Sequence, residues 1–278
     1  MSKSNKTWVI TGCSSGLGRA FAQEVLKTGY NAVVTARNPK DIQNIIESYP
    51  ETALGLALDV TDKAQVKEAA KKAEAKFGSI DVLVNNAGYG YRSAVEEADE
   101  DQVSALFNTN FFGMVSMIKA VLPTMRKQKS GVIFNVSSIA GRFSNPGSGY
   151  YSATKFAVEG MSDALSKEVA PLGIKVVVIE PGAFRTDFAG RSLTGTQTEI
   201  QDYTETAGKR RKENDHTHGT QPGDPQKAAQ AIIKIAESEI VPFRLLLGTD
   251  AIQLTYTELE NQIKELNDWK KVSLSTDY

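Results

Sequence analysis

Three features are scarce in this sequence, and each scarcity narrows what the chain can be. It has one cysteine in 278 residues, so it cannot form an internal disulfide, and this favours a reducing compartment. Its 32 Lys and Arg nearly balance its 33 Asp and Glu, so we expect no bulk attraction to nucleic acid. No apolar run approaches the ~20 residues of a membrane span. Residues 1–6 carry no signal-peptide core, so we expect a cytoplasmic protein.

The composition is that of an ordinary globular protein, 41% hydrophobic and 23% charged, and apolar runs alternate with helical patterns. Strands are expected near residues 7–11, 31–36, 54–58, 80–85, 131–137, 174–180 and 243–247. Each crossover between parallel strands needs a returning helix. The alternation therefore predicts one α/β domain over 1–278, with a doubly wound, Rossmann-like parallel sheet of about seven strands and helices on both faces.

A glycine-rich turn follows the first predicted strand, and an amphipathic helix follows the turn. Gly12, Gly16 and Gly18 have the spacing Gly-x3-Gly-x-Gly, one residue away from the Gly-x-Gly-x2-Gly fingerprint. Without Cβ atoms the backbone can approach a pyrophosphate, whose charge is stabilised by the helix N-terminus. A tight turn without a ligand is the alternative. Cys13 in this turn is interpreted as a small filler, although a thiol at a helix start can have a lowered pKa.

Tyr151 and Lys155 lie four residues apart on a predicted helix and so share one face. A lysine beside a tyrosine favours the phenolate, so we expect the pKa of Tyr151 to be lowered toward neutrality, which would suit a general acid/base. A solvated surface pair is the alternative. The neighbouring Tyr150 has Thr154, not a lysine, four residues on.

With further motifs in order along the chain, these patterns resemble the short-chain dehydrogenase/reductase family over residues 7 to about 190. The further motifs are Asp59-Val60, Asn85-Asn86-Ala87-Gly88, Asn110 in Asn-Phe-Phe-Gly113, Ser138, Pro181-Gly182 and Thr186. Ser138 precedes Tyr151 by 151 − 138 = 13 residues, as the family's catalytic serine does, and Ser137 does not have this spacing. The stretches Asn-Ala-Gly-Tyr-Gly and Pro-Gly-Ala-Phe-Arg-Thr-Asp look most like the hydroxysteroid and retinol dehydrogenase branch.

The resemblance implies an oxidoreductase that moves a hydride between the nicotinamide and a carbonyl or alcohol carbon. It implies that Tyr151 is the acid/base, that Lys155 holds the nicotinamide ribose, that Ser138 binds the carbonyl oxygen, and that Asn110 holds a water linked to Lys155. Asp59 resembles the residue that meets the adenine. The implied coenzyme contacts are Gly12, Ser14, Ser15, Gly16, Leu17, Gly18, Arg37, Asp59, Val60, Asn86, Ala87, Gly88, Tyr151, Lys155, Pro181, Gly182 and Thr186.

The choice of coenzyme is read at the end of the second predicted strand, where Ala36 and Arg37 stand. Arg37 lies 37 − 18 = 19 residues beyond Gly18. A carboxylate there would bind the ribose 2′-OH, whereas an arginine can take a 2′-phosphate with two hydrogen bonds. The sequence favours NADP(H) over NAD(H), with NAD(H) possible. An exposed arginine without a ligand is the alternative.

Residues 188–225 form the longest stretch without a strand pattern, after the expected carboxyl edge of the sheet, and we predict a substrate lid there. The run Lys209–Lys212 is interpreted as solvated, and His216 and His218 lack a third ligand, so no metal is expected. A strand and a helix are predicted over 243–272. Ile252, Tyr256, Leu259, Ile263 and Leu266 form an apolar seam, which we expect to pack on the chain's own core, or alternatively on the lid or a second subunit.

The substrate is expected to be a secondary alcohol or ketone of moderate size and apolar character. Tyr89, Tyr91 and Phe143 follow predicted strand ends and are candidates for an apolar pocket, or for the core. By resemblance, the chain is a homodimer or homotetramer that pairs through helices near 101–127 and 152–170. Two other functions stay open: a catalytically idle NADP(H)-binding sensor, and a sugar-nucleotide epimerase, which usually has a different glycine spacing and a larger C-terminal domain.

Overall fold

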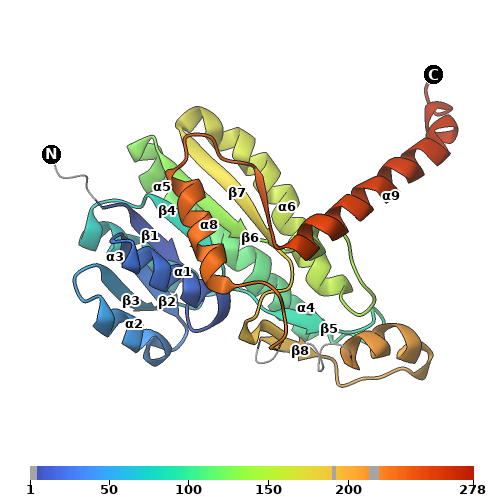
Figure 1. Ribbon diagram of the computed structural model, residues 1–278, viewed down its shortest axis with the longest axis horizontal. Coiled ribbons are helices and arrows are strands. Elements are labelled where there is room, and N and C mark those ends of the chain that lie inside the picture. Colours follow the sequence, from blue (N-terminus) through green and yellow to red (C-terminus); the bar gives the residue numbers. More distant parts are fainter. Residues whose placement is uncertain (1–4, 190–191, 213–218) are drawn as a thin grey trace.

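A seven-stranded sheet lies at the centre of the computed structural model, which describes residues 5–189, 192–212 and 219–278 (Figure 1). All of its neighbouring strands are parallel, in the order β3-β2-β1-β4-β6-β7-β9. The strands are β1 (Thr7–Ile10), β2 (Asn31–Ala36), β3 (Ala53–Ala57), β4 (Val82–Asn85), β6 (Gly131–Val136), β7 (Ile174–Pro181) and β9 (Arg244–Leu247). The predicted fold class and its seven strands are confirmed. The strand order reverses between β1 and β4, where open α/β sheets hold ligands.

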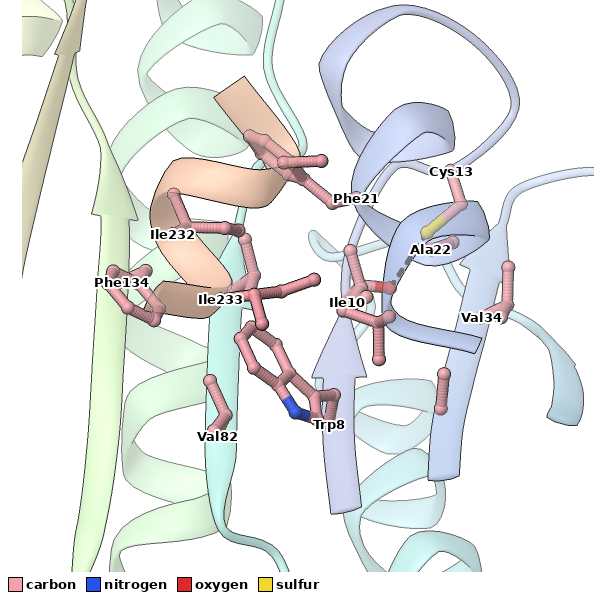
Figure 2. Close-up of a cluster of buried hydrophobic side chains, with 14 of the residues drawn as sticks. Trp8, Ile10, Cys13, Phe21, Ala22, Val34, Val82, Phe134, Ile232 and Ile233 are labelled. Carbon is pink, nitrogen blue, oxygen red and sulfur yellow. Dashed lines mark hydrogen bonds between the residues drawn. The ribbon is translucent and has the colours of Figure 1, made fainter. Parts of the chain in front are cut away.

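Helices cover both faces of this sheet. One face carries α1 (Gly16–Lys27) and α8 (Pro225–Glu237); the other carries α3 (Lys63–Phe77), α5 (Met114–Gln128) and α6 (Gly149–Val169). The shorter helices are α2 (Gln43–Ser48) and α4 (Glu100–Phe107). Successive strand side chains point to opposite faces. Trp8 and Ile10 therefore pack in the hydrophobic core beneath α1 and α8, the first core, and Val9 packs in the core beneath α3, α5 and α6, the second core. In Figure 2, Trp8 lies between the strands and Ile233 of α8.

The segment 188–225 has more regular structure than its sequence predicted. Its β8 (Leu193–Gly195) pairs in parallel with β5 (Gly90–Arg92), and short turns follow at η6 (Gln201–Tyr203) and η7 (Thr204–Gly208). The sequence of this stretch has no clear strand pattern, and β8 forms there because its pairing partner lies about a hundred residues earlier in the chain. His216 and His218 lie outside the described residues.

The C-terminal helix α9 (Thr249–Leu274) projects away from the body of the molecule (Figure 1). The predicted strand and helix are present, but the expected docking of the apolar seam on the chain's own core is wrong. Only Ala251 and Thr255 of α9 are buried, whereas Tyr256 is 66% and Leu266 66% exposed. The helix touches β9 and η3 (Ile139–Gly141) near its start. An amphipathic pattern predicts that one face of the helix is apolar, but it does not indicate which surface packs on that face.

The helical stretch Glu100–Gln128 corrects the expectation about membrane spans. By length and composition alone, this stretch of 29 residues, with a mean hydropathy of 1.3 in an 18-residue window, could cross a membrane. In the fold, Met117, Val121 and Met125 of this stretch are buried in the second core, against the sheet. Packing on the sheet accounts for these apolar residues.

Candidate functional site

The glycine turn after β1 is held in a shape that only glycine tolerates. Gly12 and Gly16 have φ angles of 71° and 58°, in the left-handed region. A Cβ on Gly18 would collide with the Gly12 carbonyl oxygen and the Asn86 amide. Asn86 Nδ2 donates to the carbonyl oxygens of Thr11 at 3.0 Å and Gly12 at 3.1 Å. The side chain that follows β4 therefore clamps the turn that follows β1.

The start of α1 is open to an anion. Its N-cap residue, Ser15, makes no side-chain capping hydrogen bond, so the first N–H groups of the helix have no partner from that side chain. Ser14 and Leu17 lie in the same turn and are partly exposed. Thr186 faces the turn, with its Cβ 3.5 Å from where a Gly16 Cβ would lie. These residues fit a bound pyrophosphate.

Cys13 belongs to the core beneath this turn. Its Sγ donates to the Ile10 carbonyl oxygen at 3.2 Å, and the side chain is buried (Figure 2). Burial raises the pKa of Cys13 to about 12, which outweighs its hydrogen bond with the Thr35 backbone and the charge of Arg19. The interpretation as a small filler is confirmed.

The ends of β2, β4 and β7 bring the remaining predicted coenzyme residues to the same edge of the sheet. The Thr11 hydroxyl accepts hydrogen bonds from the backbone N–H groups of Asn86 and Ala87, both at 3.0 Å. Arg37 is exposed directly after β2, and in the described part of the chain no hydrogen bond or ion pair engages its guanidinium. Asp59 Oδ1 accepts from the backbone N–H of Thr61 at 2.9 Å, which fixes the start of the turn before α3.

Two of these residues lie under neighbouring turns. Val60 is buried against Gly113, where a Cβ built on Gly113 would lie 2.6 Å from Val60 Cγ2. Gly182 lies against the carboxylate of Asp250, which accepts a hydrogen bond from the backbone N–H of Ala183 at 2.7 Å. Asp250 was not found from the sequence, because it lies at the start of α9, far along the chain from the Pro181-Gly182 motif.

Ser138, Tyr151 and Lys155 meet where β6 ends and α6 begins. Ser138 Oγ accepts from the Ala140 backbone N–H at 3.1 Å. Lys155 Nζ lies 5.6 Å from the centre of the Tyr151 ring and donates to the Val136 carbonyl oxygen at 2.9 Å. The structure therefore brings together the three residues that the motif spacing placed in one site.

The expected lowering of the Tyr151 pKa is not found. Burial raises the pKa of Tyr151 to about 12, although a hydrogen bond with Ser138 and the charge of Arg92 act in the opposite direction. Burial also lowers the pKa of Lys155 to about 8, against the effect of Glu159. Desolvation is the largest effect on both groups, and the centre of the Phe188 ring lies 5.8 Å from that of the Tyr151 ring. At neutral pH the phenol is protonated.

Asn110 reaches the site through an irregular turn between α4 and α5. Residues Asn108–Gly113 form a π-helical turn, a feature often found at functional sites. The Asn110 amide donates to the Tyr89 carbonyl oxygen at 2.9 Å and accepts from the Tyr89 N–H at 3.0 Å. It also lies 3.3 Å from the hydroxyl of Thr154 on α6. Gly88 lies close to the same amide, because a Cβ built on Gly88 would be 3.1 Å from Asn110 Oδ1.

Of the predicted pocket aromatics, Tyr91 is a core residue. It is buried, and its hydroxyl accepts a hydrogen bond from the Asp99 N–H at 3.1 Å. Tyr89 and Phe143 are partly exposed. Sequence reasoning missed Phe188, at the start of the predicted lid, and Arg92, whose charge acts on Tyr151.

Comparison with known families matches residues 6–196 to the family described as short chain dehydrogenase. Oxidoreductase BOA17 of Botryotinia fuckeliana is 41% identical over 272 residues, covering 98% of this chain and 99% of that protein. A 3-ketodihydrosphingosine reductase of Bacteroides thetaiotaomicron is 40% identical over 243 residues, covering 86% of this chain and 87% of that protein.

Among solved structures, a short-chain dehydrogenase from Streptomyces avermitilis has a TM-score of 0.93 at 41% identity and covers 100% of both chains, α9 included. The structure of ElxO with NADP bound has a TM-score of 0.74 at 30% identity, covering 90% of this chain and 99% of that chain. A short chain dehydrogenase/reductase from Burkholderia phymatum in complex with NAD has a TM-score of 0.80 at 23% identity, covering 94% and 96%, which shows a shared fold alone.

Proposed function

The chain belongs to the short-chain dehydrogenase family, and on that premise we propose that it transfers a hydride between NADP(H) and the carbonyl or alcohol carbon of a moderately sized substrate with a largely apolar body. The observation that supports this most is the meeting of Ser138, Tyr151 and Lys155 beside a glycine turn shaped for a pyrophosphate. Bound coenzyme supplies or accepts the hydride at its nicotinamide C4. The protein supplies the proton and the environment.

Tyr151 is the proton donor in the reductive direction. Its raised pKa keeps the phenol protonated at neutral pH, which is the form that can give a proton to a carbonyl oxygen. The Ser138 hydroxyl binds the same oxygen and stabilises the charge that develops on it. Lys155 positions the ribose and stabilises the phenolate left after proton transfer. Asn110 holds the backbone at Tyr89 and the hydroxyl of Thr154, which keeps this side of the site rigid.

NADP(H) is the proposed coenzyme because of Arg37. The guanidinium stands at the end of β2 without a carboxylate beside it in the described residues, and the position before it is Ala36. The NADP complex of ElxO supports this choice, since that protein is 30% identical.

The segment 188–225 is proposed to be a substrate lid. Phe188 lies on the Tyr151 ring, and Gly90 is close enough to Leu193 that a Cβ would lie 2.8 Å from its side chain. The apolar ring of Phe188 beside the phenol suits an apolar substrate body. The Bacteroides relative, a 3-ketodihydrosphingosine reductase, supports a ketone as the reacting group.

A homo-oligomer is proposed on the exposed seam of α9. Leu259, Ile263, Leu266 and Trp269 are all exposed on a helix that leaves the body of its own subunit. A second copy of the chain would bury this face. The match with the Streptomyces structure over its full length supports a conserved role for the helix within that architecture.

The test is oxidation of NADPH and NADH against a panel of aliphatic, aromatic and steroid ketones, with Tyr151→Phe as the test variant. Positioned proton transfer contributes about 10²–10⁴-fold, so Tyr151→Phe should lose at least a hundredfold in kcat while binding the coenzyme normally. Tyr150→Phe is the matched control, because its hydroxyl donates to the Val95 carbonyl oxygen at 3.1 Å and stays outside the proton transfer. Coenzyme binding without turnover of any carbonyl would favour an idle sensor, and equal losses in both variants would remove Tyr151 from its role.

A further inference from the structure

One positive charge beside Tyr151 has no role in the chemistry described so far. Arg92 is the last residue of β5, and its Nη1 donates to Ser148, three residues before Tyr151 at the start of α6. Its charge acts directly on the phenol, because it lowers the pKa of Tyr151 against the dominant effect of burial. Arg92 therefore lies near Tyr151, at the start of α6.

The environment of Arg92 does not neutralise it. Its Nε is buried and has no hydrogen-bond partner, and no carboxylate in the described residues forms an ion pair with it. Burial lowers the pKa of Arg92, and the charge of Arg210 lowers it further. A buried cation without a counter-charge is costly in a folded protein. A bound anion would supply the missing counter-charge.

The lid brings a second arginine to the same place. Arg211 forms an ion pair with the buried Glu97, Nη1 to Oε2 at 2.7 Å. This contact fixes its neighbour Arg210, whose charge acts on Arg92. The backbone of Arg92 is tied to the lid as well, because its carbonyl oxygen accepts from the Thr196 N–H at 3.0 Å. The described part of the lid therefore contacts Arg92 through Thr196 and places Arg210 near it.

We propose that Arg92 is a specificity residue that binds an anionic group, a carboxylate or a phosphate monoester, on a substrate whose ketone or alcohol carbon lies at Tyr151. This inference rests on the proposed function and narrows its substrate class to an apolar body with an anionic end close to the reacting carbon. An arginine binds either group through N–H···O hydrogen bonds, and here Nη1 is engaged by Ser148 while Nη2 makes no hydrogen bond in the described residues. An aliphatic ammonium at the same place is repelled.

The kinetic test compares matched pairs of substrates. Linear keto acids of increasing spacing between ketone and carboxylate are assayed beside their methyl esters, and a hydroxyketone phosphate beside the free hydroxyketone. We expect the acid or the phosphate to exceed its neutral partner in kcat/KM by about ten- to a hundredfold, the range for charge-assisted hydrogen bonds. The two pairs distinguish a carboxylate from a phosphate. Arg92→Met should bring this ratio close to one, and Arg92→Lys should retain part of it.

Arg126→Met is the control. Arg126 is exposed in the last turn of α5, and its substitution removes the same net charge as Arg92→Met. It should leave the ratio at the wild-type value. A wild-type enzyme that turns over esters as well as acids overturns the inference. An equal loss for acid and ester in Arg92→Met overturns it too, because a residue needed only for folding acts on both.

A binding experiment separates this inference from the proposed function. Calorimetry on the NADP⁺-loaded protein compares hexanoate, hexyl phosphate, hexanol and hexylammonium, so the coenzyme's own phosphates are already in place. Tighter binding of hexanoate or hexyl phosphate than of hexanol, lost in Arg92→Met, supports the anion site even if no ketone is turned over. Turnover of neutral ketones with equal binding of hexanoate and hexanol leaves the proposed function standing and refutes the anion site.

Discussion

Replacing Glu97 with Gln should release the lid without unfolding the sheet. The Glu97 carboxylate is completely buried and accepts from Arg211 at 2.7 Å and from the backbone N–H groups of Ala94 and Ile200, both at 2.9 Å. The Arg211 hydrogen bond is the main reason that its pKa falls to about 2. Because the pKa is lowered in the fold, the ionised Glu97 carboxylate stabilises the fold above the ordinary Glu pKa. This stabilisation is lost as the pH falls through about 2. The ion pair between Glu97 and Arg211 is therefore fully charged at neutral pH.

Glutamine removes this charge and places an N–H₂ group where every neighbour is a donor. Leaving one partner of a buried ion pair unpaired typically costs about 3–5 kcal/mol. If the substitution lowers the free energy of opening the lid by about 3 kcal/mol, hydrogen exchange at the amides of Thr196 and Ile200 should accelerate on the order of a hundredfold. The amides of β1 and β4 in the sheet should exchange as in the wild type. Mass spectrometry of peptides from 192–212 and from the sheet measures both.

Glu96→Gln is the control. Glu96 is the neighbouring carboxylate and also binds the lid, accepting from the Tyr203 hydroxyl at 2.6 Å, but it is exposed. A glutamine oxygen can still accept this hydrogen bond, so the effect should stay below about 1 kcal/mol. Equal acceleration in the two variants would refute the reasoning. Equal acceleration of lid and sheet in Glu97→Gln would mean that Glu97 supports the whole fold.

Three further outcomes are expected. Because burial lowers the pKa of Lys155 to about 8, the profile of kcat/KM for ketone reduction should be flat below that pH and fall above it; a flat profile to pH 10 would contradict the role of the ammonium. Arg37→Ala should weaken NADPH binding about ten- to a hundredfold and NADH binding little, and Ala36→Asp should reverse the preference, so equal losses in titrations with both coenzymes would contradict the 2′-phosphate contact. Every residue from 259 to 278 is exposed, so a chain cut after Glu258 should keep its melting temperature and coenzyme affinity. Light scattering should show that it forms a smaller oligomer, with fewer subunits than the full chain. An unchanged number of subunits would exclude α9 as the interface.

Local patterns predicted the parts of this protein that local physics determines. The strands follow from runs of apolar residues, the turn from Gly12, Gly16 and Gly18, and the proximity of Tyr151 and Lys155 from their helical spacing. Each of these depends on residues close in sequence, where side-chain period and missing Cβ atoms limit the choices.

The features that sequence reasoning missed depend on distant partners. Arg211 and Glu97 lie 114 residues apart, and β5 finds β8 across a similar separation. The raised pKa of Tyr151 follows from its burial in the folded chain, which spacing along α6 cannot reveal. The seam of α9 was misassigned because the period of an apolar face is the same whether the face packs on its own core or projects from it.

The burial of Cys13 has a practical consequence for watching this molecule move. With a pKa of about 12, only about one thiol in ten thousand is a thiolate at pH 8, and the sulfur is out of reach of solvent. The natural chain is therefore already a silent background for thiol-directed dyes and spin labels. A single cysteine introduced at exposed Ile263 or Thr198 would carry the only reactive sulfur, so the distance and mobility of α9 or of the lid could be followed spectroscopically in a protein with its native interior intact.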